Sequence, residues 1–216
     1  MARGANLTGI GLQEVCEANY NLIVYELVMK GHTGGSTGFD FKYKATIGTG
    51  VPGSMAPTPA CGAWFGNALI IRGVIGNNSW ITTFSSQTSG GLGEKQNAIC
   101  AWTSVMICTT HTKAENLTVA GAQSGEYRAM VNTWRPAALT AFATGDFNLE
   151  PSTNYMLAWT NDSFRDADYF DPYFDTTTDG GAHIDYILRK NPAVWSADAF
   201  ISPAGWSDHH WKEGYY

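Results

Sequence analysis

The sequence predicts a protein of mixed α-helices and β-strands, of the α+β (α/β) class, that forms one domain over residues 1–216. Short apolar runs bounded by glycine and proline recur along the chain, and such runs are typical of buried strands. Other segments carry apolar residues at helical spacing. No internal repeat or linker divides the chain, and its length is sufficient for one sizeable core.

The predicted elements cover most of the chain. Strands are expected at residues 7–15, 39–44, 64–72, 80–84, 98–110, 137–143 and 183–188. A helix is expected after the first strand, ending at Gly31, and a second over Val119–Trp134. A short third helix is expected to start at a Ser152 or Thr153 cap and to run through Trp159.

Four cysteines allow three disulfide pairings, and none shows the Cys-x-x-Cys spacing of a zinc site. On one straight strand, Cys100 and Cys108 would lie about 26 Å apart, whereas a disulfide tolerates only about 7 Å between Cα atoms. A hairpin that turns near Thr103 and Ser104 would place the two cysteines opposite each other. Buried free thiols are the alternative for an intracellular protein.

The composition and the charge limit the possible partners. Hydrophobic residues make up 44% of the chain and charged residues 15%, as expected for an ordered globular protein. The net charge of −6 should repel nucleic acid, so a nuclease would need a local basic patch or a bound cation. No apolar run is long enough to span a membrane, and residues 1–4 do not read as a secretory signal.

The strongest local signal for a functional site is the pair Asp146 and Asn148, which follows the apolar run 137–143. On an extended backbone, residues two apart leave the same face. A carboxylate beside an amide would suit a phosphate that is held by a hard cation. The alternative is a plain Asx turn that caps the strand.

Seven polar residues lie at or near the predicted strand ends: Glu14, His111, Asp146, Asn148, Asp185, Asp208 and His209. The segments that match a known superfamily, in order and in rough spacing, are Leu12-Gln13-Glu14, Gly66-Asn67-Ala68-Leu69, Thr110-His111, Gly145-Asp146-Phe147-Asn148, Ile184-Asp185-Tyr186 and Ser207-Asp208-His209. Over nearly its whole length the chain thereby resembles the endonuclease/exonuclease/phosphatase superfamily, whose members share the DNase I-like fold.

The resemblance implies a four-layer sandwich, in which two mixed β-sheets pack face to face and helices flank them. The family opens with a strand that carries a metal-binding Asn well upstream of its Gln-Glu pair. Only thirteen residues precede Glu14 here, so we expect that first strand to be missing, as in an N-terminally truncated domain.

The resemblance also implies metal-dependent cleavage of a phosphate ester. Glu14 and Asp208 would bind Mg²⁺, or else Mn²⁺ or Ca²⁺. His209 would be the general base that activates water, oriented by Asp185, and His111 would hold the phosphate or protonate the leaving group. Asp146, Asn148 and Asn67 are expected to position the nucleophile or to contact the phosphate. Arg72, at the end of its predicted strand, would also face the phosphate, and the alternative is a plain exposed arginine at a strand end.

Among family members, the cysteine-containing motifs are most similar to secreted bacterial proteins, including relatives of the cytolethal distending toxin nuclease. That similarity implies the disulfides Cys16–Cys61 and Cys100–Cys108, an extracytoplasmic location, and a monomer that hydrolyses nucleic acid, DNA above all. One alternative is a sphingomyelinase-like enzyme that contacts membrane lipid through an aromatic loop: Phe164, Tyr169, Phe170, Tyr173 and Phe174. A second alternative is a non-catalytic binding module on the same fold.

Overall fold

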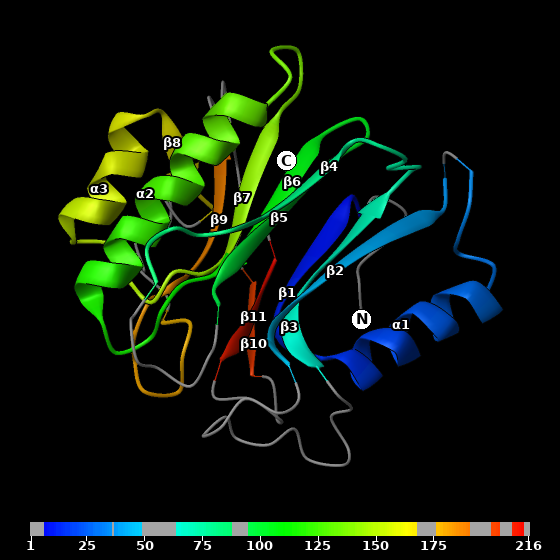
Figure 1. The fold of residues 1–216 in the computed structure, drawn as a ribbon, viewed down its shortest axis with the longest axis horizontal. Helices are drawn as coiled ribbons and strands as arrows, with labels where there is room; N and C mark the ends of the chain where they lie inside the picture. The colour runs from blue at the N-terminus through cyan, green and yellow to red at the C-terminus, as the bar shows by residue number, and fades with distance from the viewer. Residues whose placement is uncertain are drawn as a thin grey trace. The chain divides into compact units, whose positions relative to one another are not determined.

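The computed structural model describes residues 7–35, 37–48, 64–87, 95–167, 176–190, 200–203 and 209–213. The chain divides into two compact units, Met1–His111 and Thr112–Tyr216, which we call the N-terminal and the C-terminal unit. Figure 1 shows the course of the chain through both units. No helix in the described part of the chain is long and apolar enough to cross a membrane.

The described part of the N-terminal unit contains two sets of antiparallel strands and one helix. One sheet has the order β1 (Gly9–Cys16), β3 (Trp64–Arg72), β2 (Phe39–Gly48), and the helix α1 (Glu17–Met29) contacts all three of its strands. The other strands of the unit are β4 (Ser79–Thr83), β5 (Asn97–Trp102) and β6 (Met106–His111), paired in that order.

The two sheets of the N-terminal unit pack against each other. Strand β3 contacts both β5 and β6, and β1 also contacts β6. The side chains of Leu69 and Ile71 on β3 and of Ile99 on β5 are completely buried, as expected for facing apolar sheets. The predicted packing of two sheets with an outer helix is therefore confirmed within this unit.

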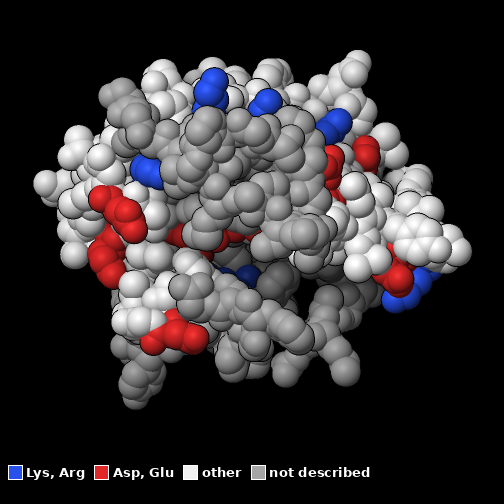
Figure 2. Space-filling view, turned by 60° about the horizontal axis from the view of Figure 1, so that its bottom comes forward, with Lys and Arg blue, Asp and Glu red and all other residues white. Residues whose placement is uncertain are grey.

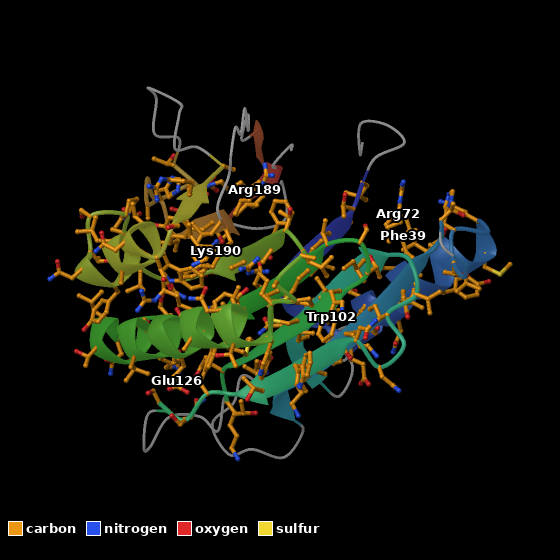
Figure 3. All side chains as sticks on the ribbon, turned by 90° about the horizontal axis from the view of Figure 1, so that it is seen from above. Phe39, Arg72, Trp102, Glu126, Arg189 and Lys190 are labelled. Carbon is orange, nitrogen blue, oxygen red and sulfur yellow. A yellow bond between two sulfur atoms is a disulfide. The ribbon has the colours of Figure 1, made fainter. Side chains whose placement is uncertain are left out.

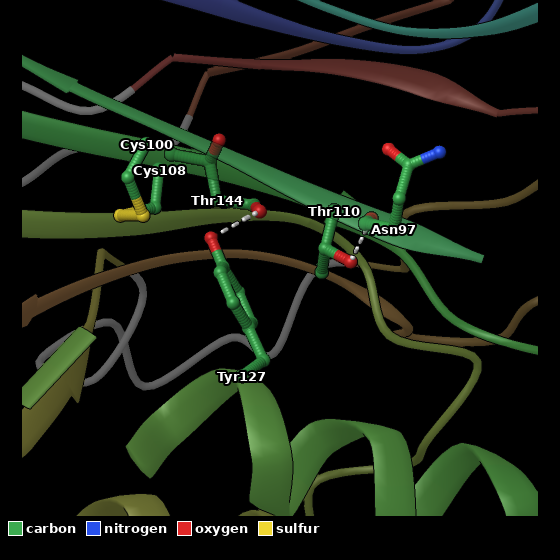
Figure 4. The surroundings of a disulfide bond; sticks show 6 residues. All are labelled: Asn97, Cys100, Cys108, Thr110, Tyr127 and Thr144. Atoms are coloured by element: carbon green, nitrogen blue, oxygen red, sulfur yellow. Dashed lines mark hydrogen bonds between the residues drawn. A yellow bond between two sulfur atoms is a disulfide. The ribbon is translucent and has the colours of Figure 1, made fainter. Parts of the chain in front are cut away.

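The predicted hairpin in residues 98–110 is also confirmed. Strands β5 and β6 pair antiparallel, with Cys100 directly opposite Cys108. The two form a disulfide with a Cα–Cα distance of 4.0 Å (Figure 4). Cys16 also takes part in a disulfide. Its expected partner, Cys61, lies outside the described residues, so that pairing remains a prediction.

The C-terminal unit contains two helices and five strands in its described part. Helix α2 (Leu117–Trp134) precedes β7 (Ala141–Asp146), and α3 (Asn154–Asn161) precedes β8 (Phe164–Asp166) and β9 (Asp185–Lys190). The antiparallel order is β7-β9-β8, and β10 (Phe200–Pro203) pairs with β11 (His210–Glu213). The cap of α3 is Thr153, whose hydroxyl accepts from the N–H of Met156, as predicted.

Buried aromatic rings form the core of the C-terminal unit. Trp159 of α3 packs edge-on against Phe147, Tyr127 and Phe164, with ring centroids 4.7–5.5 Å apart. Its indole N–H donates to Ser124 Oγ on α2 at 2.8 Å, so the buried polar atom is satisfied. Because Phe164 belongs to this core, the expectation that it joins an exposed membrane-binding loop is wrong. The other four aromatic residues of that loop lie outside the described part of the chain.

Candidate active site

Two carboxylates meet at one end of the C-terminal unit's sheet. Strand β7 ends at Asp146 and β9 begins at Asp185, and the antiparallel register places these two residues directly opposite each other. The Asp146 side chain is buried, and that of Asp185 is mostly so. Because cross-strand neighbours lie only about 5 Å apart, two acidic groups converge although they are far apart in sequence.

His209 lies against both carboxylates. It forms a β-bridge with Thr178, and its side chain is 31% exposed. Its Nδ1 is 2.9 Å from Asp185 Oδ2, whereas its Nε2 is 3.8 Å from Asp146 Oδ2. Donation from Nδ1–H to Asp185 leaves the lone pair on Nε2, on the side of Asp146. The arrangement is that of a base whose orientation is set by a carboxylate.

Asn148 lies differently from the prediction. Its φ is +49°, and its N–H donates to Asp146 Oδ1 at 2.8 Å, so the chain forms an Asx turn immediately after β7. The expectation of an extended backbone with both side chains on one face is therefore wrong, and the Asx-turn alternative is correct. The Asn148 amide donates to the carbonyl of Thr112 at 3.0 Å, and the N–H of Thr112 donates to the carbonyl of Asp146. Asn148 thus braces the loop that presents Asp146.

A second acid–imidazole pair lies in the N-terminal unit. Glu14 occupies an irregularity of β1, where the pairing with β3 shifts register, and its φ is +53°. Non-glycine residues rarely adopt this conformation. The Glu14 side chain is 57% exposed, and its Oε1 lies 3.5 Å from Nδ1 of the buried His111. Glu14 is therefore the carboxylate partner of His111, a contact that the sequence did not reveal.

The two residues expected to contact the phosphate, Asn67 and Arg72, lie apart on β3, and their role remains a prediction. Asn67 is fully buried between the sheets of its unit, where its amide donates to the carbonyl of Asn97 at 3.2 Å. Arg72 lies at the far end of β3, about 16 Å along the strand from Asn67, which pairs beside Glu14. There its guanidinium stacks over Phe39 at 5.5 Å (Figure 3).

The donor groups in the described residues fit a hard divalent cation in part. Asp146, Asp185 and His209 offer ligand atoms within 4.8 Å of one another, and the hydrogen bond from His209 Nδ1 occupies one Asp185 oxygen. Within the N-terminal unit, the exposed carboxylate of Glu14 offers oxygen atoms of the kind that Mg²⁺ prefers. The other expected ligand, Asp208, lies outside the described residues.

The charges in the described part of the chain are scattered. On the face shown in Figure 2, the described lysines and arginines do not gather into one patch, and acidic side chains lie among them. The local basic patch that a metal-free nuclease would need is not seen on this face among the described residues. A bound cation is the alternative way to attract a phosphate to a chain of net charge −6.

A third polar cluster, which the sequence did not predict, is formed by Asp166, His183 and Lys212 in the C-terminal unit. His183 Nε2 lies 3.1 Å from Asp166 Oδ2, and Lys212 Nζ donates to both carboxylate oxygens. Each member belongs to a different segment, and none lies in a motif. The only sequence feature that could have indicated this cluster is the position of Lys212, three residues after His209.

The fold is the DNase I-like α+β fold, because solved structures of endonuclease/exonuclease/phosphatase proteins resemble the chain. No family model and no curated protein sequence matches the chain. Among solved structures, the human nocturnin catalytic domain with bound sulfate is 19% identical, with a TM-score of 0.60, over 94% of this chain and 77% of that chain.

Two bacterial structures give the same result. The mannosyl-6-phosphatase of Bacteroides thetaiotaomicron is 14% identical with a TM-score of 0.56, over 94% of this chain and 83% of its own. An endonuclease/exonuclease/phosphatase of Beutenbergia cavernae is 15% identical with a TM-score of 0.62, over 94% of this chain and 60% of its own. The likeness establishes the predicted fold, and the roles of individual residues remain predictions.

Proposed function

We propose that the protein is a metal-dependent phosphoric-ester hydrolase, and more specifically a secreted phosphodiesterase that cleaves nucleic acid. The observation that carries the proposal is the 2.9 Å bond from His209 to Asp185, with Asp146 on the other side of the imidazole ring. A base oriented in this way is suited to take a proton from water near neutral pH.

In the proposed reaction, Nε2 of His209 takes the proton of the attacking water, and Asp185 stabilises the imidazolium that forms. Asp146, fixed by the Asx turn, accepts a hydrogen bond from the same water and so orients it. Glu14 and Asp208 would bind Mg²⁺, and the bound ion would neutralise charge on the phosphoryl oxygens. Mn²⁺ and Ca²⁺ are hard cations that the same oxygen donors would accept.

His111 is proposed to bind the phosphate or to protonate the leaving group. Its Nδ1 faces Glu14 at 3.5 Å, so the carboxylate can hold the imidazole in one orientation. A protonated imidazole could serve either role, since it donates a hydrogen bond and carries a positive charge.

Two observations support a nucleic-acid substrate and an extracytoplasmic location. A solved structure of similar fold, ANGEL2, is described as a 2′,3′-cyclic phosphatase and was solved with adenosine-2′,3′-vanadate, so this fold accommodates a nucleotide phosphate analogue in that protein. The Cys100–Cys108 disulfide is typical of proteins in oxidising compartments. No observation on the described residues favours a phospholipid substrate.

The proposal is tested by offering plasmid DNA, RNA, sphingomyelin vesicles and mannose 6-phosphate to the purified protein, with Mg²⁺ and with EDTA. We expect cleavage of nucleic acid that EDTA abolishes. Hydrolysis of another substrate but not of nucleic acid would support a phosphoric-ester hydrolase and would contradict the nucleic-acid substrate. The absence of any hydrolysis with Mg²⁺, Mn²⁺ or Ca²⁺ would favour a binding module.

A further inference from the structure

The polar cluster of Asp166, His183 and Lys212 lies next to the proposed catalytic pair in the C-terminal unit. Lys212, on β11, is only 5% exposed, and its Nζ is 3.0 and 3.2 Å from the two oxygens of Asp166. Asp166 ends β8, and its Oδ1 also accepts the N–H of Ile187 on β9. The cluster therefore ties three strands together.

Lys212 also reaches the residue that orients His209. Its Nζ donates to the backbone carbonyl of Asp185 at 3.3 Å. On the other side, the N–H of Asp185 donates to Thr177 Oγ1 at 3.1 Å. The backbone of Asp185 is thus held at both its N–H and its C=O, while its carboxylate receives the imidazole N–H of His209.

The Asp166–His183–Lys212 cluster is better suited to fix the position of β11 against β8 and β9 than to increase the free energy of unfolding. Burial would raise the pKa of the Asp166 carboxyl, but the Lys212 charge and the His183 contact lower it overall, so the carboxylate stays charged. The cost of desolvating a buried ion pair offsets much of its attraction. Strand β11 is four residues long and pairs only with β10 among the described strands, and an isolated two-stranded hairpin is marginally stable. An anchor at Lys212 compensates for that weakness.

We infer that Lys212, held by Asp166 and His183, is a positioning residue that keeps Asp185 and His209 in their hydrogen-bonded geometry. The inference rests on the proposed function insofar as that pair performs catalysis. Lys212 touches no reacting atom in this account, and it acts through the Asp185 carbonyl and through the strand that follows His209.

The test compares Lys212→Met with a matched control, Lys190→Met. Lys190, labelled in Figure 3, lies at the other end of β9, about 16 Å along the strand from Asp185. Its mostly buried side chain also pairs with an aspartate, Asp162. Lys212→Met should lower kcat by roughly tenfold to a hundredfold at an almost unchanged KM, because a small misplacement of catalytic groups costs this much. Lys190→Met should lower the melting temperature and leave kcat close to that of the wild type. Equal effects of the two variants on kcat would overturn the inference.

A second measurement does not depend on activity. The Nδ1 proton of His209, assigned with His209→Gln, should give a slowly exchanging NMR signal in the wild type and in Lys190→Met, and should be lost in Lys212→Met. A retained signal in Lys212→Met would overturn the inference. If the wild type hydrolyses no phosphate ester, the proposed function fails and this comparison still decides whether Lys212 positions the pair.

Misfolding of Lys212→Met is addressed by the double variant Asp166→Asn/Lys212→Met, which leaves no unpaired buried charge. Replacement of a whole buried ion pair by neutral groups is often tolerated. The double variant should therefore fold, yet it should show the same losses in kcat and in the His209 proton signal. A folded double variant with wild-type kcat and an intact signal would contradict the positioning role.

Discussion

The pair of His209 and Asp185 shows how two residues from distant segments acquire one chemical role. Their bond is 2.9 Å long, and the imidazole ring has Asp146 on its other side. The β7–β9 register sets the spacing of the two carboxylates, and the bridge to Thr178 brings the histidine to them. Backbone pairing therefore places all three side chains.

Replacement of the proposed general base should abolish most of the activity. His209→Ala should lower kcat by about a hundredfold or more, the usual contribution of a general base. The fold should persist, because the side chain is partly exposed and no part of the apolar core. His32→Ala, at an exposed position after α1, is the matched control and should keep the wild-type rate. Steady-state kinetics on both variants decide the assignment, and a fully active His209→Ala would refute it.

The buried Asp166 should make the stability depend on pH. Because its pKa is lower in the folded protein than in the unfolded chain, its contribution is complete above the unfolded value of about 3.9 and is lost as the pH falls through the lowered folded value. At pH 7, Asp166→Asn should cost about 3–5 kcal/mol, since it leaves Lys212 buried without its partner. Urea unfolding should show this difference shrinking below about pH 4.

The control for this titration is Asp162→Asn. Asp162 also pairs with a lysine, Lys190, but its side chain is 37% exposed. Solvent screens such a pair, so its removal should cost about 1 kcal/mol or less. Equal losses from both variants at pH 7 would show that burial does not set the strength of the Asp166 pair.

At the scale of single elements, the close pairing of β2 and β3 makes a further prediction. A Cβ on Gly66 would lie 2.1 Å from the carbonyl oxygen of Lys44 and 2.7 Å from Cα of Ala45, both of them backbone atoms of β2. Gly66→Ala should therefore destabilise the protein by about 1–3 kcal/mol. Gly125→Ala, in α2, meets no atom within 4 Å and should stabilise the protein by about 0.5–1 kcal/mol. Thermal melts that rank the two variants in the opposite order would contradict the close approach of these two strands.

Most elements were predictable from the sequence because local patterns determine them. The apolar run of β3 has the predicted bounds, Trp64–Arg72, and the Cys100–Cys108 disulfide that the resemblance implied required the β5–β6 hairpin. The turn after β7 was not predictable, because Asp and Asn suit both an extended strand end and an Asx turn. Only the hydrogen bond from Asn148 to Asp146 decides between them.

The sequence predicted which residues belong to the candidate site better than it predicted the contacts of their side chains. The resemblance named His209 and Asp185, and the structure brings them together. It also named Asn67, but a motif does not report burial, and this side chain turns inward between two sheets. The Lys212 contacts depend on three segments that share no pattern, so no local signal could have revealed them.

For the molecule as a whole, the state of the cysteines tests the proposed extracytoplasmic location. Protein secreted into an oxidising medium and then denatured without reductant should show no titratable thiols, because Cys16, Cys100 and Cys108 are all disulfide-bonded. Thiol titration checks this. Free thiols in such a preparation would argue against the extracytoplasmic location, and protein reduced before denaturation is the positive control.

The net charge of −6 makes the whole molecule dependent on a cation for phosphate binding, in this account. Glu14, whose carboxylate is exposed, is one of the proposed ligands of that cation. Glu14→Gln should raise the Mg²⁺ concentration needed for half-maximal activity by about tenfold or more, because a neutral amide is a poorer ligand for a hard cation. A magnesium titration of both proteins measures the shift, and an unchanged requirement would remove Glu14 from the metal site.

The most direct test of the central claim is the rate at which wild type and Asp185→Asn release nitrophenolate from bis(p-nitrophenyl) phosphate in Mg²⁺. The amide keeps the size of the carboxylate but removes the charge that orients and stabilises His209. We expect the wild type to hydrolyse this ester in a reaction that EDTA abolishes, and the variant to be slower by about a hundredfold or more. A variant as fast as the wild type, or a wild type inactive with Mg²⁺, Mn²⁺ and Ca²⁺, would contradict it.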